Sequence, residues 1–196
     1  MSDGEEKYMN KEYAIELRPI NEEDSELVVK WRNSTQVKQF FIYQKDISIE
    51  EQHRWIDTKV KTGKVIQFII VEKATNKPIG SVYFRDIDYD MHKAEYGIFI
   101  GEASARGKGY GTQAAELMIT YAFEKLNLHR IYLRVLSENK QAITSYKKAG
   151  FLQEGVLKDD VFINGKYHDI IWMSIISDEY KRGKEENESV ICDSML

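Results

Sequence analysis

The stretch Gly101–Met118, GEASARGKGYGTQAAELM, holds the residue types and the spacing best suited to chemistry in this 196-residue chain. Gly107, Gly109 and Gly111 alternate with a lysine and a tyrosine, between an alternating apolar run and a helical pattern. Glycines spaced in this way let successive backbone N–H groups turn toward one point. A helix that begins near Thr112 adds unpaired amides and the positive end of its dipole. The stretch is therefore predicted to bind a pyrophosphate.

Two well-known nucleotide motifs do not fit this loop. A P-loop has four residues between its first glycine and the Gly-Lys pair, and a Ser or Thr follows. Here five residues separate Gly101 from Gly107, and Gly109 follows Lys108. A dinucleotide-binding loop runs G-x-G-x-x-G inside a βαβ unit, whereas these glycines run G-x-G-x-G. Arg106 and Lys108 are expected to add positive charge to the pyrophosphate site.

The hydrophobic periodicity around the loop predicts an alternation of strands and helices. Strands are predicted at 15–20, 65–72, 79–87, 94–100, 129–136, 151–161 and 167–176, and helices at 21–33, 48–63, 112–126 and 139–150. Ser48 and Glu51 form a capping box at the start of the second helix, and Asn164–Gly165 is a typical hairpin turn. This order predicts an α+β layer fold with a mostly antiparallel sheet.

The composition narrows the class of protein further. Apolar residues make up 42% and charged residues 31%, which is typical of a globular chain, and the net charge of −4 argues against nucleic-acid binding. One cysteine, Cys192, excludes a disulfide framework and a cysteine-based metal site. The polar N-terminus does not resemble a signal peptide, so a cytoplasmic location is expected. We expect a flexible N-terminus over 1–14, one domain over 15–177 and a charged tail over 178–196.

Arg106, Gly109 and Gly111 match the R/Q-x-x-G-x-G/A signature of the GNAT acetyltransferases, and the resemblance extends over roughly Ile15 to Ile176. The segment YAFEKLNLHRIYLRVLSENKQAITSYKKAGFLQEG is similar to the RimJ/RimL-type branch of that superfamily. That branch includes ribosomal-protein N-terminal acetyltransferases and spermidine acetyltransferases. The loop, helix, strand and Asn–Tyr helix also occur in the order found in the family.

The resemblance implies the GNAT fold, a mixed but mostly antiparallel seven-stranded sheet with helices on both faces. It implies acetyl-CoA as donor, with its pyrophosphate on the glycine loop and its pantetheine arm between splayed strands at 94–100 and 129–136. The four histidines are scattered without Cys/His or HExxH spacing, so no metal site is expected. The sequence leaves the oligomeric state open; dimers are common among similar proteins, which makes a homodimer a candidate assembly. The implied cofactor-binding residues are Ile98, Phe99, Ile100, Arg106, Gly107, Lys108, Gly109, Tyr110, Gly111, Thr112, Asn139 and Tyr146.

Acetyl transfer from a thioester to an amine needs a deprotonated amine, a polarised carbonyl and a proton for the leaving thiolate. Glu95, on a strand that would flank the thioester, is the candidate base, acting through water; a surface ion pair is the alternative for this residue. Tyr146 is the candidate acid, since the family pattern N-x-x-A-I-x-x-Y-x-K-x-G-F is matched from Asn139 to Phe151. The alternative for Tyr146 is a core position.

The acceptor pocket in this family is built largely by the first two helices and the last hairpin. Trp31, Arg32 and Asn33 resemble the corresponding segment of nucleotide-sugar amine N-acetyltransferases, in which an aromatic ring would stack on the ligand and Arg32 would meet a phosphate. His53 and His168 are candidates for the edge of this pocket, and a surface or packing role is the alternative for each. Trp31 and Trp55 also fall at apolar helix positions, where they would simply be core residues.

Other acceptors stay open. A polyamine would need acidic side chains near the pocket, but the candidates lie in first turns of helices, where the helix dipole explains them: Glu22, Glu23, Asp24, Glu50 and Glu51. A peptide N-terminus is a third acceptor class. The sequence thus predicts an enzyme that moves an acetyl group from acetyl-CoA directly to a primary amine of a small molecule or peptide. The rival from another class is a module that binds acetyl-CoA without catalysis, as a sensor.

Overall fold

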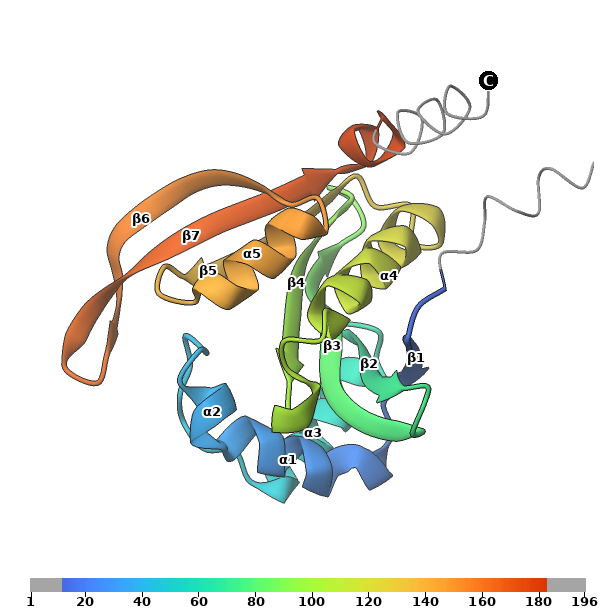
Figure 1. Ribbon diagram of the computed structural model, residues 1–196, viewed down its shortest axis with the longest axis vertical. Helices are drawn as coiled ribbons and strands as arrows, with labels where there is room; N and C mark the ends of the chain where they lie inside the picture. Colours follow the sequence, from blue (N-terminus) through green and yellow to red (C-terminus); the bar gives the residue numbers. More distant parts are fainter. Residues whose placement is uncertain (1–11, 183–196) are drawn as a thin grey trace, which may run out of the picture.

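Figure 1 shows the computed structural model, which describes residues 12–182. The strands are β1 (Ile15–Pro19), β2 (Ile66–Glu72), β3 (Lys77–Asp88), β4 (Lys93–Ile100), β5 (Arg130–Leu136), β6 (Leu152–Ile163) and β7 (Lys166–Ile176). The helices are α1 (Ser25–Asn33), α2 (Thr35–Lys38), α3 (Ile49–Trp55), α4 (Tyr110–Glu124) and α5 (Lys140–Lys148). Shorter 3-10 or π turns lie at Glu22–Asp24, Ile56–Val60 and Ala103–Ala105.

The seven strands form one sheet in the order β1-β2-β3-β4-β5-β7-β6, in which the β4–β5 pair is parallel and the others are antiparallel. β4 and β5 pair at only three positions, of which the last joins Glu95 to Tyr132. Beyond this point β4 stays paired with β3 as far as Ile100, and β5 stays paired with β7 as far as Leu136. The two central strands therefore diverge, and a wedge opens from Glu95.

Different helices cover the two faces of the sheet (Figure 1). On one face α4 and α5 pack on β3, β4 and β5 in the main core, which includes Met118 and Tyr96. On the other face α1, α2 and the turn after α3 form a second core, which includes Trp31 and Phe99. Because side chains alternate along a strand, Glu95 shares the face of Phe99 rather than that of Tyr96. Residues on both faces of the sheet, such as Glu95 on one and Tyr96 on the other, therefore line the wedge.

β6 and β7 form a long hairpin that curves away from the rest of the sheet (Figure 1). Asn164 and Gly165 at its tip both have a positive φ, at 50° and 80°, as the predicted Asn-Gly turn requires. The Asn164 amide donates a hydrogen bond to Gln44 Oε1 at 3.1 Å. The hairpin tip therefore contacts the loop between α2 and α3.

The predicted order of strands is confirmed, and the helices differ in that the short α2 was not predicted. α4 begins at Tyr110, two residues earlier than predicted, because Gly109 adopts the left-handed conformation of its N-cap. The predicted helix 48–63 divides after Trp55 into an α-helical and a π-helical part. Residues 177–182 are helical, and Tyr180 packs its ring against Phe123 at 5.2 Å, so this part of the tail is ordered. Residues 1–11 and 183–196, with Cys192, lie outside the described residues.

Candidate active site

The loop between β4 and α4 has the backbone of an anion cradle. Gly107 and Gly109 have φ of +75° and +81°, and a Cβ built on either would meet nothing within 4 Å. Glycine is therefore needed there for its conformation and not for lack of space. Gly109 is also the N-cap of the 15-residue helix α4, so the unpaired amides of the first turn lie beside it. This geometry supports the predicted pyrophosphate site.

Gly111 has a different role from the other two glycines. It lies inside α4, and a Cβ at this position would come within 3.3 Å of Ser145 Oγ on α5. The Thr112 and Ser145 hydroxyls lie 2.9 Å apart and join the same two helices. Gly111 therefore permits close packing of α4 on α5, and its amide lies in the first turn of the helix, so its predicted contribution to the anion cradle stays a prediction.

The two cations of the loop already have protein partners. Arg106 Nε and Nη2 donate to the carbonyl of Ile100 at 3.2 and 3.1 Å, which ties the loop to the end of β4. Lys108 Nζ lies 3.4 Å from Glu72, and Tyr110 donates its hydroxyl to the same carboxylate at 2.7 Å. Hydrogen bonds from Thr75, Tyr110 and Lys108 lower the pKa of Glu72 to about 2, although desolvation opposes them. The backbone amides are thus the main hydrogen-bond donors that this loop offers to an anion.

Tyr146 lies at the apex of the wedge. Asn139 caps its helix by accepting from the amide of Ala142 at 3.2 Å, as predicted. Tyr146 is 8% exposed. Its ring lies edge-on to that of Tyr96, with ring centroids 6.0 Å apart, and Tyr96 is the first β4 residue beyond the last β4–β5 pair. Burial raises the pKa of Tyr146 well above its ordinary value. Its hydroxyl makes no hydrogen bond to any residue within 12–182, so Tyr146 keeps a proton that is free to be donated.

Glu95 is buried at the same apex, between two arginines. Arg85 Nη2 donates to its carboxylate at 2.8 Å, and Arg134 Nε and Nη2 donate at 3.2 and 3.3 Å. Burial alone would raise the pKa of Glu95, but Arg85 and then Arg134 outweigh burial and hold the pKa below its usual value. A carboxylate held in this way is a weak proton acceptor. Proton abstraction by Glu95 stays a prediction, which this geometry disfavours.

Arg32 is a cation without an acidic partner. Its guanidinium carbon lies 3.5 Å from the centre of the Phe41 ring, and its Nη1 is enclosed without a hydrogen-bond partner. Burial lowers the pKa of Arg32; nearby Tyr83 opposes this, and Arg85 lowers it further. Within residues 12–182 no carboxylate forms an ion pair with Arg32. Arg32, Arg85 and Arg134 therefore make a cationic cluster that holds one carboxylate, Glu95.

The other residues predicted to bind the acceptor do not join this arginine cluster. Trp31 is 3% exposed and donates its indole N–H to Glu102 at 2.8 Å, so it is a core residue. Asn33 exchanges two 2.9 Å hydrogen bonds with the backbone of Ile47 and fixes the α2–α3 loop. His53 is exposed on α3, and His168 Nδ1 lies 3.0 Å from Glu138. Of this predicted set, Arg32 alone approaches the cluster.

Sequence reasoning missed the residues that surround Glu95. Tyr83 lies opposite Gly97 in the sheet, and a Cβ on Gly97 would come within 2.3 Å of the Tyr83 ring. Tyr132 stacks on Trp172 with centroids 5.6 Å apart and planes at 11°. Strand alternation assigns Tyr83 and Arg85 to one face, but only the register places that face beside Glu95. These residues make the site aromatic as well as cationic.

The site as a whole fits the implied donor. Its glycine cradle, the first turn of α4, the diverging strands and an unengaged tyrosine hydroxyl suit an anionic cofactor that carries a thioester. When bound, acetyl-CoA supplies the activated acetyl group. Among residues 12–182, no three His, Cys, Asp or Glu side chains gather where they could hold a metal ion, and no helix is long and apolar enough to span a bilayer.

Comparisons with known proteins agree with this arrangement. The family model of the GNAT acetyltransferase domain matches residues 14–152. The chain is 31% identical over 172 residues to the spermidine N(1)-acetyltransferase of Escherichia coli, covering 88% of this chain and 91% of that protein. It is 33% identical over 105 residues to a putative ribosomal N-acetyltransferase of Bacillus subtilis, covering 54% of this chain and 57% of that protein.

Solved structures show the same fold. The spermidine N-acetyltransferase of Vibrio cholerae in complex with CoA and spermine superimposes with a TM-score of 0.80 at 29% identity, over 85% of this chain and 98% of that one. A dodecameric structure of the same Vibrio cholerae enzyme gives a TM-score of 0.73 at 28% identity, over 85% and 96% of the two chains. The predicted seven-stranded GNAT fold and the acetyl-CoA donor are thereby confirmed. The chain belongs to the GNAT acetyltransferase family and is an acetyl-CoA-dependent N-acetyltransferase.

Proposed function

We propose that the acceptor is the primary amine of a small molecule that also carries an anionic group, such as a phosphate or a carboxylate. Arg32 carries this proposal, because a half-buried guanidinium without a counter-ion costs free energy that an anionic ligand would recover. Arg85 and Arg134 reinforce it, since both share one carboxylate, Glu95. Nucleotide amino sugars are one class of compound that combines an amine with phosphate.

In the proposed reaction the amine attacks the thioester at the apex of the wedge. A water molecule takes the ammonium proton, and the new C–N bond forms as the C–S bond breaks. The attacking nitrogen releases its second proton to solvent, and Tyr146 donates its proton to the leaving sulfur before regaining one from solvent. Glu95 stays ionised and holds Arg85 and Arg134 in place for the acceptor. No covalent intermediate on the protein is required.

A polyamine is the second candidate, because the Escherichia coli and Vibrio cholerae relatives are spermidine acetyltransferases. The charges around the apex disfavour it. Among the acids that the sequence offers for a polyamine, Asp24 lies 2.7 Å from Arg18, Glu22 pairs with Lys61, and Glu51 closes a capping box with Ser48. The three arginines near the apex would also repel a second ammonium group.

The test is thiol release from acetyl-CoA across a panel of amines. The panel contains a uridine-diphosphate amino sugar, a phosphate-free amino sugar, spermidine, an aminoglycoside and a short peptide with a free N-terminus. The proposal predicts the highest kcat/KM for the phosphate-bearing amine, and an Arg32→Ala variant that loses this preference. Spermidine as the best acceptor would overturn the anionic assignment. Tight acetyl-CoA binding with no release for any amine would support the sensor instead.

We also propose a homodimer formed through the β6–β7 hairpin. Its support is the group of large apolar side chains that this hairpin exposes: Leu152, Val156, Leu157, Phe162 and Tyr167. Burying members of this group against a second copy would remove them from water. Light scattering should give twice the chain mass for the wild type and a monomer for Phe162→Ser. A monomeric wild type at micromolar concentration would refute the proposal.

A further inference from the structure

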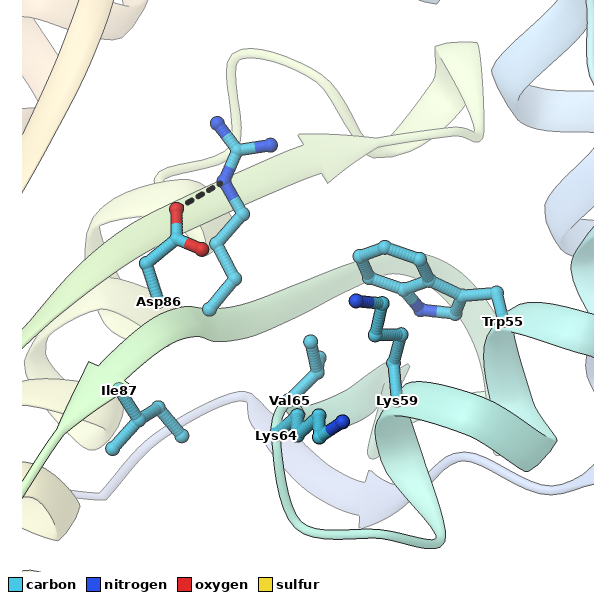
Figure 2. Close-up of a pocket in the computed structure, with 7 residues that line it drawn as sticks. Trp55, Lys59, Lys64, Val65, Asp86 and Ile87 are labelled. Carbon is cyan, nitrogen blue, oxygen red and sulfur yellow. Dashed lines mark ion pairs between the residues drawn. The ribbon is translucent and has the colours of Figure 1, made fainter.

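A recess of about 370 Å³ lies beside the arginine cluster, because Arg85 is one of the residues that line it (Figure 2). Its lining comes from the end of α3, the π turn, the start of β2 and the end of β3: Trp55, Lys59, Lys64, Val65, Arg85, Asp86 and Ile87. Its volume is within the range of small-molecule sites. The reaction described above leaves this recess unused.

The indole of Trp55 is held rigidly at this recess. Its N–H donates to Gln67 Oε1 at 2.9 Å, Gln67 donates to Ser81 Oγ at 3.0 Å, and Ser81 donates to the carbonyl of Phe68 at 2.9 Å. This chain of hydrogen bonds anchors the ring to β2 and β3. Trp55 is nevertheless half-buried rather than enclosed, and Figure 2 shows its ring at the cavity beside Lys59. A fixed, partly exposed indole is a ready stacking surface.

The charges that line the recess are predominantly positive. Lys59 and Lys64 form no ion pair with any residue within 12–182, whereas Lys61 between them pairs with Glu22 and Asp57. The one carboxylate in the lining is Asp86, whose oxygen lies 3.9 Å from Arg85 Nε. Three cations therefore face one acid. The Arg85 Nε atom is also enclosed without a hydrogen-bond partner.

Arg85 connects this recess to the chemistry, because its Nη2 holds Glu95 at 2.8 Å while its side chain lines the cavity. A ligand in the recess would therefore contact the same side chain that holds Glu95 at the apex of the wedge. We propose that the recess is the distal subsite of the acceptor and binds the part of the acceptor that carries both a phosphate and a planar ring. Lys59, Lys64 and Arg85 hold the phosphate, and the ring stacks on Trp55. This inference rests on the proposed function, in which the acceptor amine carries an anion.

Binding is tested with uridine 5′-monophosphate, in the presence of saturating CoA so that the donor site is filled. The indole N–H signals in nitrogen-15 NMR report on the three tryptophans, and Trp55→Phe identifies the signal of Trp55. The nucleotide should shift that signal and compete with the acceptor. Uridine tests the contribution of the ring alone, and inorganic phosphate tests the contribution of the charge alone. Each should bind more weakly than uridine 5′-monophosphate. Absence of a shift at Trp55, or binding without competition, overturns the proposal.

Variants at exposed lysines test the charges without disturbing the core. Lys59→Ala/Lys64→Ala should raise the nucleotide Kd and the KM of a phosphate-bearing amine by about tenfold for each charge-assisted hydrogen bond that is removed. The KM of acetyl-CoA should not change. Lys125→Ala/Lys181→Ala, which removes the same charge from exposed positions elsewhere, should match the wild type. Equal effects of the two double variants would reduce the recess to a generally charged surface and refute the inference.

The failure of this inference is distinguishable from the failure of the proposed function. A wild type that acetylates phosphate-bearing amines, with Lys59→Ala/Lys64→Ala unchanged, refutes the recess alone. A wild type that acetylates spermidine and rejects every anionic amine refutes the proposed acceptor class and, with it, the recess as an acceptor subsite.

Discussion

Replacing Glu95 with glutamine tests whether this residue is an anchor for arginines or a catalytic base. The amide would keep the shape of the side chain but remove the charge that Arg85 and Arg134 share. The Glu95 side chain is 6% exposed, whereas those of Arg85 and Arg134 are 36% and 33% exposed. The two arginines would therefore regain part of their hydration, and the loss of stability would be smaller than for a fully buried ion pair.

The expected loss of stability in Glu95→Gln follows from the hydrogen bonds that Glu95 accepts. A hydrogen bond to a charged group contributes about 1.5–3 kcal/mol. The bond from Arg85 is short, the two from Arg134 are longer, and both partners are partly solvated, so we expect the variant to be destabilised by about 2 kcal/mol. For a chain of this size that change lowers Tm by about 4–8 °C.

The contribution of the ionised Glu95 to the free energy of unfolding depends on pH. Because the folded pKa of Glu95 lies below its ordinary value of 4.5, its stabilisation is present above that value and is lost as the pH falls through the folded pKa. The gap in unfolding free energy between wild type and Glu95→Gln should be full at pH 7 and shrink below about pH 4.5. Chemical denaturation across this range measures it, with the exposed Glu16→Gln as control. Equal stability at pH 7 would refute the anchor.

Two glycines offer further predictions. Gly109→Ala places a side chain on a residue with φ of +81°, which costs about 1–2 kcal/mol, and it should weaken acetyl-CoA binding about tenfold in calorimetry. Gly155→Ala is the control. An unchanged acetyl-CoA Kd for Gly109→Ala would contradict the anion cradle. Gly97→Ala would bring a Cβ within 2.3–2.5 Å of the Tyr83 ring, so the ring must move and the acceptor KM should rise while the acetyl-CoA Kd holds; a crystal structure with Tyr83 unmoved would contradict this.

Much of the fold could be predicted from periodicity, because buried strands such as 65–72 and capped helices leave strong local patterns. The wedge came from the family resemblance and not from periodicity. The register between neighbouring strands could not be predicted from the sequence. Glu95 stood out as a carboxylate in an apolar strand, but its contacts with Arg85 and Arg134 depend on how three strands align, which local patterns do not encode.

A second limit of the sequence is that it does not show which of two roles a residue takes. Trp31 and Arg32 are adjacent on α1, and the sequence left open whether Trp31 would stack on a ligand or join the core. Trp31 is buried because Gly101 leaves room for its ring, since a Cβ there would come within 2.2 Å of it. Gly111 shows the same limit, because a glycine needed for close packing and one needed for a positive φ are the same letter in a sequence.

The central claim is that acetyl transfer occurs at the apex of the wedge with Tyr146 as proton donor. Tyr146→Phe removes a hydroxyl that bonds to no residue within 12–182, so stability and the acetyl-CoA Kd should stay within experimental error of the wild type. The most direct measurement is single-turnover acetyl transfer by this variant with its best amine acceptor. A fall of about 10²–10⁴ in rate, with acetyl-CoA binding unchanged, is the predicted result. Turnover equal to that of the wild type would contradict the account.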